Sequence, residues 1–332
     1  IPATGIPDGR SMRKSGNELS NYATGMKRFM RTLLAVVLIG ASTVVHVLPL
    51  LVVALVKAAV RVEPVRRWCD QWLMTLAESW IGLNSWMIDN LTDTRIVVDG
   101  MPDAGLGGNY LVISNHQSWV DIPVLQKIFN RRLPLLRFFL KSRLIWVPLL
   151  GLAWWALDFP FMKRYSKQTL AKRPELAGRD IEATRRACCK FSDIPVAVMN
   201  FVEGTRFSPA KHAGQDSPYR HLLKPRAGGI AFVLDAMGDN IDTLVDVTIS
   251  YCGPAPSLPD LFANKVSEIR VSVRTLPISQ VPQCRAEGGD YTTDAEYRAR
   301  FQRWINDLWR EKDLTIDALR SRAGPSPSPD AR

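Results

Sequence analysis

An apolar stretch near the N-terminus constrains this 332-residue chain more than any other feature of its sequence. The stretch Leu33–Val60 is almost wholly apolar and is interrupted only by His46, Pro49 and Lys57. A secretory signal has an apolar region of only about 7–15 residues before its cleavage site, whereas about 20 apolar residues span a bilayer. We therefore expect a membrane-anchoring segment rather than a signal peptide.

Charged residues on both sides of this stretch limit how it lies in a membrane. Basic residues flank both ends: Lys27, Arg28 and Arg31 before it, and Arg61, Arg66 and Arg67 after it. Because Lys and Arg concentrate on the cytoplasmic side, a hairpin turning near His46–Pro49 keeps both clusters there. Each arm then holds about 14 residues, or roughly 21 Å of helix, which is short of a ~30 Å core. We favour a re-entrant or shallow hairpin, with one kinked span as the alternative.

The segments around this stretch complete a four-part division of the chain. Tryptophan recurs in residues 69–91, which is typical of a helix at the lipid–water boundary, although a buried helix of the following domain fits equally well. We expect residues 1–31, which are polar and basic, and the Pro/Ser-rich residues 323–332 to be disordered. Residues 32–91 then form the membrane anchor, as a hairpin or span plus an interfacial helix, and residues 92–322 form one domain.

Strands and helices alternate through residues 92–322. The strand candidates are Arg95–Asp99, Tyr110–Ser114, Arg137–Leu140, Leu157–Met162, Pro195–Val202, Leu244–Tyr251 and Glu268–Thr275. The helix candidates are Ile122–Phe129, Asp180–Phe191, Gly229–Met237 and a last helix that starts with a capping box from Thr293 to Glu296. Strands interleaved with helices predict an α/β layer fold.

Composition narrows the class of protein. Hydrophobic residues make up 46% of the chain and charged residues 23%, which excludes a wholly disordered chain, a coiled-coil rod and a multi-span membrane protein. Five cysteines, with Cys188 and Cys189 adjacent, form no even framework, so a reducing compartment fits best. The net charge of +11 favours anionic partners such as nucleic acid, anionic lipid or phosphorylated substrates.

The first candidate site lies in the segment Asn115–Asp121, directly after an apolar strand. On one continuous helix, residues five apart differ by about 140° around the axis, so His116 and Asp121 meet only if the histidine lies in a turn. Asp121 is a good N-cap and Pro123 is tolerated in a first turn, so the next helix opens at the aspartate. The carboxylate would then hold one ring nitrogen and leave the other to take a proton from a substrate hydroxyl. The alternative is a histidine in a polar turn beside an ordinary N-cap.

Two further segments also follow strands. In Glu203–Arg206 the glycine lets backbone approach a ligand, and the arginine suits a phosphate group. Open α/β sheets gather their chemistry at the carboxyl ends of strands, which favours a site here, with a structural ion pair between Glu203 and Arg206 as the alternative. The segment Phe161–Arg164 ends in two cations, for which a solvated basic edge is the alternative.

Together these motifs resemble the glycerolipid acyltransferases, specifically the 1-acyl-glycerol-3-phosphate acyltransferase family. The resemblance runs from about Trp68 to Trp309 and rests on Asn-His-x4-Asp, Phe-Met-Lys-Arg and Phe-Val-Glu-Gly-Thr-Arg in this order. The runs Leu222–Gly229 and Trp154–Asp158 are similar to the membrane-bound branch that acts on lysophosphatidate or other lysophospholipids. The strand at Leu244–Ile249 lacks the proline of the family's fourth block. The resemblance implies a single α/β acyltransferase domain with a mixed central sheet flanked by helices, preceded by the N-terminal hydrophobic membrane-anchoring segment.

The resemblance also implies a reaction. His116, oriented by Asp121, removes the proton from the free hydroxyl of a lysophospholipid, and the oxygen attacks the thioester of acyl-CoA or acyl-ACP without an acyl-enzyme. The expected acceptor is 1-acyl-glycerol-3-phosphate, which gives phosphatidate; glycerol-3-phosphate and head-grouped lysophospholipids are the alternatives. The substrate-binding residues that the resemblance implies are Arg164 and Arg206 on the phosphate, Glu203, Gly204 and Thr205 around it, and Lys141 as a further phosphate contact. For Lys141 a surface lysine at a strand end is the alternative.

The expected partners follow from this reaction. They are a membrane lipid acceptor, an acyl thioester donor, an anionic membrane surface and, as an alternative donor carrier, acyl carrier protein. We expect no metal and no cofactor, because the reaction needs none and no Cys/His cluster offers a metal site. We expect no nucleic acid, because no binding module with interleaved aromatic and basic residues is visible. The expected location is a bacterial-type inner (cytoplasmic) membrane, with the catalytic domain facing the cytoplasm. The non-enzyme alternative, a lipid-binding protein with an inactive site, is disfavoured by the intact His116, Asp121 and Glu203.

Overall fold

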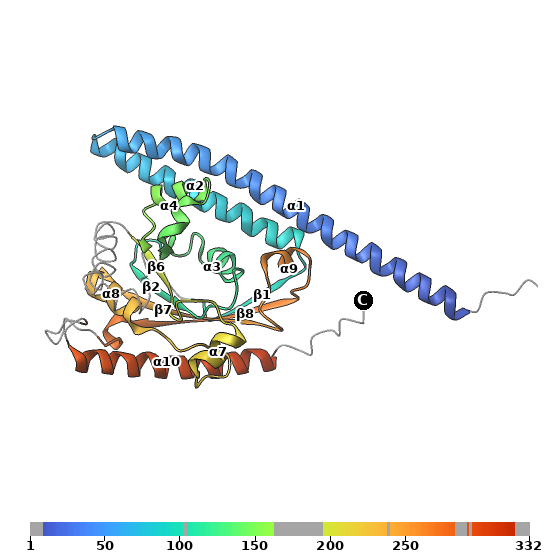
Figure 1. Ribbon diagram of the computed structural model, residues 1–332. Coiled ribbons are helices and arrows are strands. Elements are labelled where there is room, and N and C mark those ends of the chain that lie inside the picture. The colour runs from blue at the N-terminus through green and yellow to red at the C-terminus, as the bar shows by residue number, and fades with distance from the viewer. Residues whose placement is uncertain are drawn as a thin grey trace, which may run out of the picture.

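A long helical hairpin lies on an α/β domain in this protein (Figure 1). The computed structural model describes residues 9–101, 105–162, 195–237, 240–282, 291 and 294–322. The predicted helix at 180–191, the pair Lys163 and Arg164, the cap at Thr293 and the tail at 323–332 lie outside the described residues.

The first arm of the hairpin is one continuous helix, α1 (Gly9–Ala59). The predicted turn near His46–Pro49 is therefore wrong. Pro49 removes one helical hydrogen bond, but Val47 and Leu50 on either side of it are buried, and this packing offsets the loss. The disorder predicted for residues 1–31 is also wrong from Gly9 onward, because extending a helix already formed costs little.

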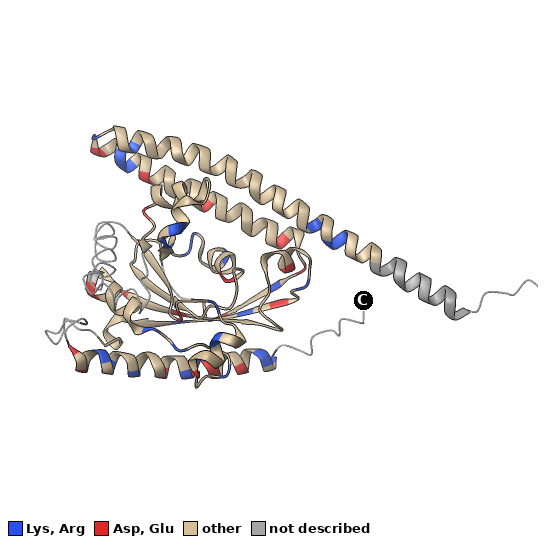
Figure 2. Ribbon diagram, in the orientation of Figure 1, with Lys and Arg blue, Asp and Glu red and all other residues tan. Residues whose placement is uncertain are grey.

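The second arm, α2 (Glu63–Leu91), returns along α1 after a break at residues 60–62. Leu73, Ala77 and Ile81 are spaced one turn apart and are buried in the same core cluster as residues of α1. The tryptophans Trp68, Trp72 and Trp86 are exposed. Among the described residues, one helical stretch, Tyr22–Ala59, is long and apolar enough to cross a membrane by length and composition, and Figure 2 shows its uncharged middle.

The domain is built on a six-stranded sheet in the order β1-β8-β7-β2-β6-β3. These strands are β1 (Arg95–Asp99), β2 (Tyr110–Ser114), β3 (Leu136–Phe138), β6 (Ala197–Phe201), β7 (Thr243–Tyr251) and β8 (Glu268–Pro277). Among the strands that the structure describes, only β7 and β8 pair antiparallel, so the predicted mixed sheet is confirmed. A separate pair of short strands is formed by β4 (Leu140–Lys141) and β5 (Phe161–Met162). The strand predicted over 137–140 is thus split between two sheets.

Helices cover both faces of the sheet (Figure 1). They are α3 (Asp121–Phe129), α4 (Leu150–Ala156), α7 (Pro209–Gln215), α8 (Ala227–Met237), α9 (Leu258–Phe262) and α10 (Ala295–Arg322). The hairpin, α3 and α4 pack on one face, and α8 and α10 pack on the other. Helices α4, α7 and α9 were not predicted. They have only five to seven residues each, which is too short to show a helical repeat of apolar residues.

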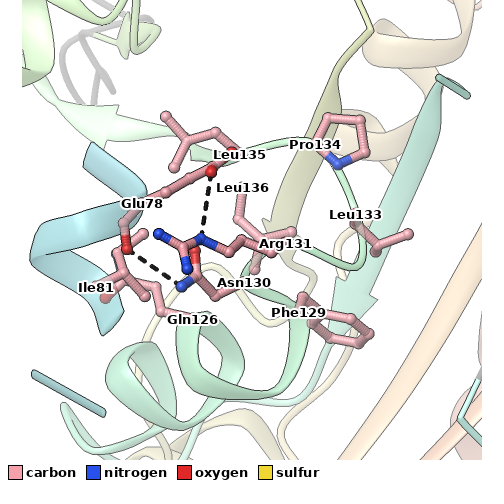
Figure 3. A pocket seen from close by; sticks show the side chains of 10 residues that line it. All are labelled: Glu78, Ile81, Gln126, Phe129, Asn130, Arg131, Leu133, Pro134, Leu135 and Leu136. Atoms are coloured by element: carbon pink, nitrogen blue, oxygen red, sulfur yellow. Dashed lines mark hydrogen bonds and ion pairs between the residues drawn. The ribbon is translucent and has the colours of Figure 1, made fainter. Parts of the chain in front are cut away.

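The hairpin is joined to the domain at the C-terminal end of α3. Asn130 Nδ2 donates a 3.2 Å hydrogen bond to the backbone oxygen of Glu78 on α2, and Arg131 lies 3.6 Å from the Glu78 carboxylate. These residues line a small pocket between α2, α3 and the start of β3 (Figure 3). Because Asp121 begins α3 at its other end, this one helix connects the hairpin to the candidate site.

Candidate active site

The turn between β2 and α3 brings His116 and Asp121 together. Nδ1 of His116 lies 2.8 Å from Oδ2 of Asp121, as the spacing predicted. The backbone amides of Gln117 and Ser118 donate to the same oxygen at 2.7 and 2.9 Å. Asp121 is the first residue of α3 rather than its N-cap, so its carboxylate organises the turn before the helix instead of capping the helix.

The neighbouring strand β7 clamps this turn. The side-chain amide of Asn115 accepts from the backbone nitrogen of Ile249 and donates to its backbone oxygen, both at 2.9 Å. Gln117 Nε2 donates to the same oxygen at 3.2 Å. The paired bonds from Asn115 continue the β2–β7 ladder beyond its last register pair, Ser114 with Val247. This segment, Asn115–Asp121, which we call the catalytic turn after its expected role, is therefore held in register with the sheet.

Tyr251, at the end of β7, is a site residue that the sequence analysis missed. Its hydroxyl donates to Oδ1 of Asp121 at 2.5 Å. Burial, and then the charge of Asp121, raise the pKa of Tyr251 well above its usual value, so the hydroxyl keeps the proton that it donates. The signal in the sequence is weak: a tyrosine two residues after Ile249, on a strand that only the structure places beside β2.

The imidazole of His116 stacks on Phe201, the last residue of β6. The ring centroids lie 3.8 Å apart with 13° between the planes, and Phe201 in turn stacks on Phe138 of β3 at 5.9 Å. The His116 side chain is 12% exposed. With Nδ1 committed to Asp121, Nε2 is the ring nitrogen left for a substrate proton.

The segment Glu203–Arg206 lies directly beside His116. The amide of Phe207, at its far end, donates to the backbone oxygen of His116 at 2.7 Å, and Val202 donates to Ser114 at 3.3 Å. Gly204 has φ +69°, a left-handed conformation in which other residues are strained. The glycine therefore lets the chain turn tightly at the strand end, and the two predicted motifs meet there.

Glu203 lies beneath this turn rather than at its surface. It is only 1% exposed, and neither carboxyl oxygen has a hydrogen-bond partner of good geometry. Burial, and then the negative charge of Asp121, raise the pKa of Glu203 well above its usual value, with Lys312 acting in the opposite direction. Glu203 was predicted to line the phosphate pocket. Because it is buried, it can support the turn from below but cannot contact a ligand at the surface.

Arg206 and Thr205 lie at the surface of the same turn. The Arg206 guanidinium is exposed and lies 4.6 Å from the ring centroid of Trp119, which follows His116 in the catalytic turn. In the part of the chain that the structure describes, Arg206 forms no ion pair with Glu203, so that alternative is not supported. Lys211 donates to the Thr205 hydroxyl at 2.7 Å and to the Arg206 backbone oxygen at 2.9 Å, which fixes the turn.

The remaining predicted phosphate contacts are placed only in part. Lys141 is exposed at the end of β4, where it pairs in register with Met162 of β5. Within the described ranges it makes no hydrogen bond or ion pair with the catalytic turn. Arg164 lies outside the described residues. Lys141 and the described part of the second motif, Phe161–Met162, thus lie on neighbouring strands, and a phosphate contact of Lys141 or Arg164 stays a prediction.

A buried ion pair supports β7 from the opposite face of the sheet. The Lys312 ammonium, on α10, donates to Asp246 Oδ1 at 2.5 Å, to the Val247 backbone oxygen at 2.7 Å and to the Thr248 hydroxyl at 3.1 Å. Arg274 adds a 2.7 Å bond to the other Asp246 oxygen. The sequence gave no signal of this pair, because its two members lie 66 residues apart.

The assembled site pairs a proton acceptor with an exposed cation. A histidine held by a buried carboxylate can act as a general base, and a neighbouring arginine can bind a phosphate. Among the described residues, no three His, Cys, Asp or Glu side chains lie close enough together to hold a metal ion. The geometry therefore fits acid–base chemistry on a phosphorylated molecule.

Comparison with known proteins agrees with this chemistry. The profile of the family described as Acyltransferase matches residues 94–251, which include the whole catalytic turn. A 1-acyl-sn-glycerol-3-phosphate acyltransferase gamma of Mus musculus is 29% identical over 193 residues, covering 55% of this chain and 45% of that protein. Lysocardiolipin acyltransferase 1 of Mus musculus is 24% identical over 259 residues, covering 73% of this chain and 62% of that protein. The chain thus spans about half the length of the curated relatives it matches.

A solved structure has the same fold. The crystal structure of the 1-acyl-sn-glycerophosphate acyltransferase PlsC from Thermotoga maritima superposes with a TM-score of 0.53, at 14% identity, over 88% of this chain and 98% of that one. Residues 94–251, which contain His116 and Asp121, thus match an acyltransferase domain. The chain is similar to lysophosphatidate and lysophospholipid acyltransferases in these comparisons.

Proposed function

We propose that this protein transfers a fatty acyl group from acyl-CoA or acyl-ACP to the free hydroxyl of 1-acyl-glycerol-3-phosphate and so forms phosphatidate. One observation carries the proposal: His116 is held by Asp121 at 2.8 Å and lies beside the turn that exposes Arg206. A base and a phosphate-binding cation on adjoining turns suit an acceptor that carries both a hydroxyl and a phosphate.

The reaction proceeds by direct transfer. Nε2 of His116 takes the proton from the acceptor hydroxyl as its oxygen attacks the thioester carbonyl. Asp121 stabilises the imidazolium that forms, since its carboxylate already accepts from Nδ1. The tetrahedral intermediate then collapses: the C–S bond breaks, and the leaving thiolate takes the proton from His116. The products are the acylated lipid and the free thiol, and the histidine returns to its neutral form.

The phosphate of the acceptor binds at Arg206, with Arg164 as a second contact. The Arg206 guanidinium is exposed over Trp119, and the backbone of its turn is fixed by Lys211. Gly204 gives this turn its tight shape, and Thr205 completes its outer edge. No metal or cofactor takes part in this scheme.

The helical hairpin holds the enzyme at the membrane that contains its acceptor. Helix α1 has an uncharged stretch between Arg31 and Lys57 (Figure 2). The domain then lies at the cytoplasmic face, where the acyl thioester is made and where Lys and Arg side chains gain about 1 kcal/mol each near anionic lipid. Labelling of a cysteine placed at Arg322 in sealed and permeabilised cells tests this orientation, and labelling in sealed cells would contradict it.

A head-grouped lysophospholipid is the second candidate acceptor. Lysocardiolipin acyltransferase 1 is similar to this chain over 259 residues, a longer span than the 193 residues of the match to the 1-acyl-sn-glycerol-3-phosphate acyltransferase. Both acceptors offer a free hydroxyl and a phosphate to the same two groups, His116 and Arg206.

A parallel acyl-CoA assay tests the proposal. Membranes containing the protein receive lysophosphatidate, glycerol-3-phosphate, lysophosphatidylglycerol or lysocardiolipin, and membranes with His116→Ala are the control. We expect the rate of acyl transfer to be highest with lysophosphatidate, which gives phosphatidate. A higher rate with lysocardiolipin would select the second candidate, and no transfer to any acceptor would overturn the proposal.

A further inference from the structure

A cluster of large apolar side chains is exposed between β4 and β5. The chain there forms a short 3₁₀ helix (Ser142–Trp146) followed by α4 (Leu150–Ala156). Trp146 is 84% exposed, Trp155 is 61% exposed and Leu152 is 50% exposed. We call residues 142–156 the aromatic segment. Three such side chains exposed within ten residues are unusual at a surface that faces only water.

The aromatic segment has a built shape rather than a loose one. A Cβ atom on Gly151 would lie 2.0 Å from the backbone oxygen of Ile145, so the two short helices touch through backbone. Leu149, between them, has φ +61°, a conformation that is strained for a non-glycine residue. Ala153 and Ala156 on the inner side of α4 are buried. Tight packing thus holds the segment in a conformation that exposes both tryptophans.

Two features of the surroundings identify what covers this surface. First, α4 packs against α1 (Figure 1), and Leu48, Val52 and Leu55 of α1 are also exposed, so both helices of this contact carry exposed apolar side chains. Second, residues 140–157 contain Lys141 and Arg143 and no acidic residue. Tryptophan beside basic residues is the pattern of a protein surface at the lipid–water boundary, where cations also meet anionic head groups.

We propose that the aromatic segment inserts Trp146, Leu152 and Trp155 into the lipid interface as a second membrane contact, separate from the hairpin. The hairpin alone can fix the protein to a bilayer, but a second contact sets how the domain is tilted on it. The occupant of this surface is thus a lipid bilayer rather than another protein.

The aromatic segment follows closely in the chain after a row of stacked rings that ends at His116. The aromatic segment begins four residues after Phe138, whose ring stacks on Phe201 at 5.9 Å. Phe201 stacks on His116 at 3.8 Å. Insertion of the segment would therefore place the lipid surface on the side of the domain where this row of rings begins. Its effect on activity rests on the proposed function, whereas its insertion does not.

Insertion is measured directly on the full chain in vesicles of phosphatidylcholine with phosphatidylglycerol. After replacement of the native cysteines by serine, an environment-sensitive fluorophore is attached to a single cysteine at Trp146, Trp155 or Leu314. Leu314, on α10, is 65% exposed and serves as the matched apolar control. We expect a blue shift and protection from an aqueous quencher at 146 and 155, and neither at 314. Full quenching at 146 and 155 would overturn the proposal, whether or not the protein is active.

An activity assay is the second test of the proposal. The double variant Trp146→Ser, Trp155→Ser is compared with Leu314→Ser on lysophosphatidate in vesicles and on a dispersed short-chain analogue. We expect about a tenfold loss on vesicles, a ratio equivalent to ~1.4 kcal/mol, and an unchanged rate on the dispersed acceptor. An equal loss on both acceptors would show that the tryptophans act inside the domain, which contradicts the proposal. No activity in the parent protein would instead contradict the proposed function and leave the fluorescence result valid.

Discussion

The Tyr251 hydroxyl donates a hydrogen bond to Oδ1 of Asp121, the carboxylate whose other oxygen accepts from Nδ1 of His116. Asp121 is fully buried, and a buried charge is stable only when it is paired and hydrogen-bonded. Four donors meet this need: the tyrosine, the histidine and the amides of Gln117 and Ser118. The site is thus organised before any substrate arrives.

Removing the tyrosine hydroxyl tests this arrangement. In Tyr251→Phe, Asp121 loses its one donor on Oδ1, at a cost of about 1–3 kcal/mol, so we expect kcat to fall roughly 5- to 150-fold. The KM for the acceptor should change little, because Tyr251 is buried. The control is Tyr297→Phe on α10, which removes a hydroxyl that donates to the backbone oxygen of Pro282. Equal kcat values in both variants and the parent would contradict a positioning role.

Arg206→Ala tests the phosphate contact. A charge-assisted hydrogen bond contributes about 1.5–3 kcal/mol, so we expect the acceptor KM to rise roughly 10- to 150-fold with the donor KM nearly unchanged. Arg220→Ala, at another exposed arginine that pairs with Asp317, is the matched control. If the donor KM rises instead, the arginine binds the thioester substrate and the phosphate assignment is wrong.

Glu203→Gln tests the buried carboxyl through stability. Because its pKa is raised in the folded protein, the folded state holds this proton at a pH where the unfolded chain, with a glutamate pKa of about 4.3, has lost it. Stability is therefore lost as pH rises above about 4.3 toward the folded-state pKa. Glutamine does not ionise, so we expect Glu203→Gln to have the higher Tm at pH 8 and a flatter dependence of Tm on pH. A steeper dependence in the variant would contradict this assignment.

Lys312→Met tests the support beneath β7. Removing one partner of a buried ion pair costs about 3–5 kcal/mol, because Asp246 is left charged with only Arg274 beside it. We expect a lower midpoint of denaturant unfolding in Lys312→Met and partial recovery in the double variant with Asp246→Asn. Arg310→Met, at an exposed pair with Asp307, should leave the midpoint unchanged. If the double variant loses more unfolding free energy than the two single variants lose together, the ion pair is not the source of the loss.

The parts of the fold and site that the sequence predicted are those set by local pattern. The strand Tyr110–Ser114 has the predicted bounds, since five buried residues between polar turns allow little choice. The His116–Asp121 contact followed from helical geometry and the helix start at Asp121. The Glu203–Arg206 turn was expected at the same site because both motifs follow strands, and the structure shows that these strands, β2 and β6, are parallel neighbours.

The parts that the sequence did not predict depend on contacts between distant segments. Tyr251 meets Asp121 only because β7 lies beside β2, and Lys312 meets Asp246 only because α10 crosses that strand. The turn predicted near His46–Pro49 failed for the same reason: packing of α1 on α2 offsets the cost of Pro49 inside a helix. The burial of Glu203 could not be predicted either, because its motif alone suggests a surface contact.

The most direct test of the account is the rate of phosphatidate formation by His116→Ala. The control is His221→Ala, because His221 also pairs with an aspartate, Asp317 at 2.8 Å, but on the side of α10. With lysophosphatidate and acyl-CoA in vesicles, and equal amounts of membrane-bound protein, we expect His116→Ala to lose about 10²- to 10⁴-fold in rate. We expect His221→Ala to stay close to the parent. A rate in His116→Ala within a few-fold of the parent would contradict the role of this histidine as the general base.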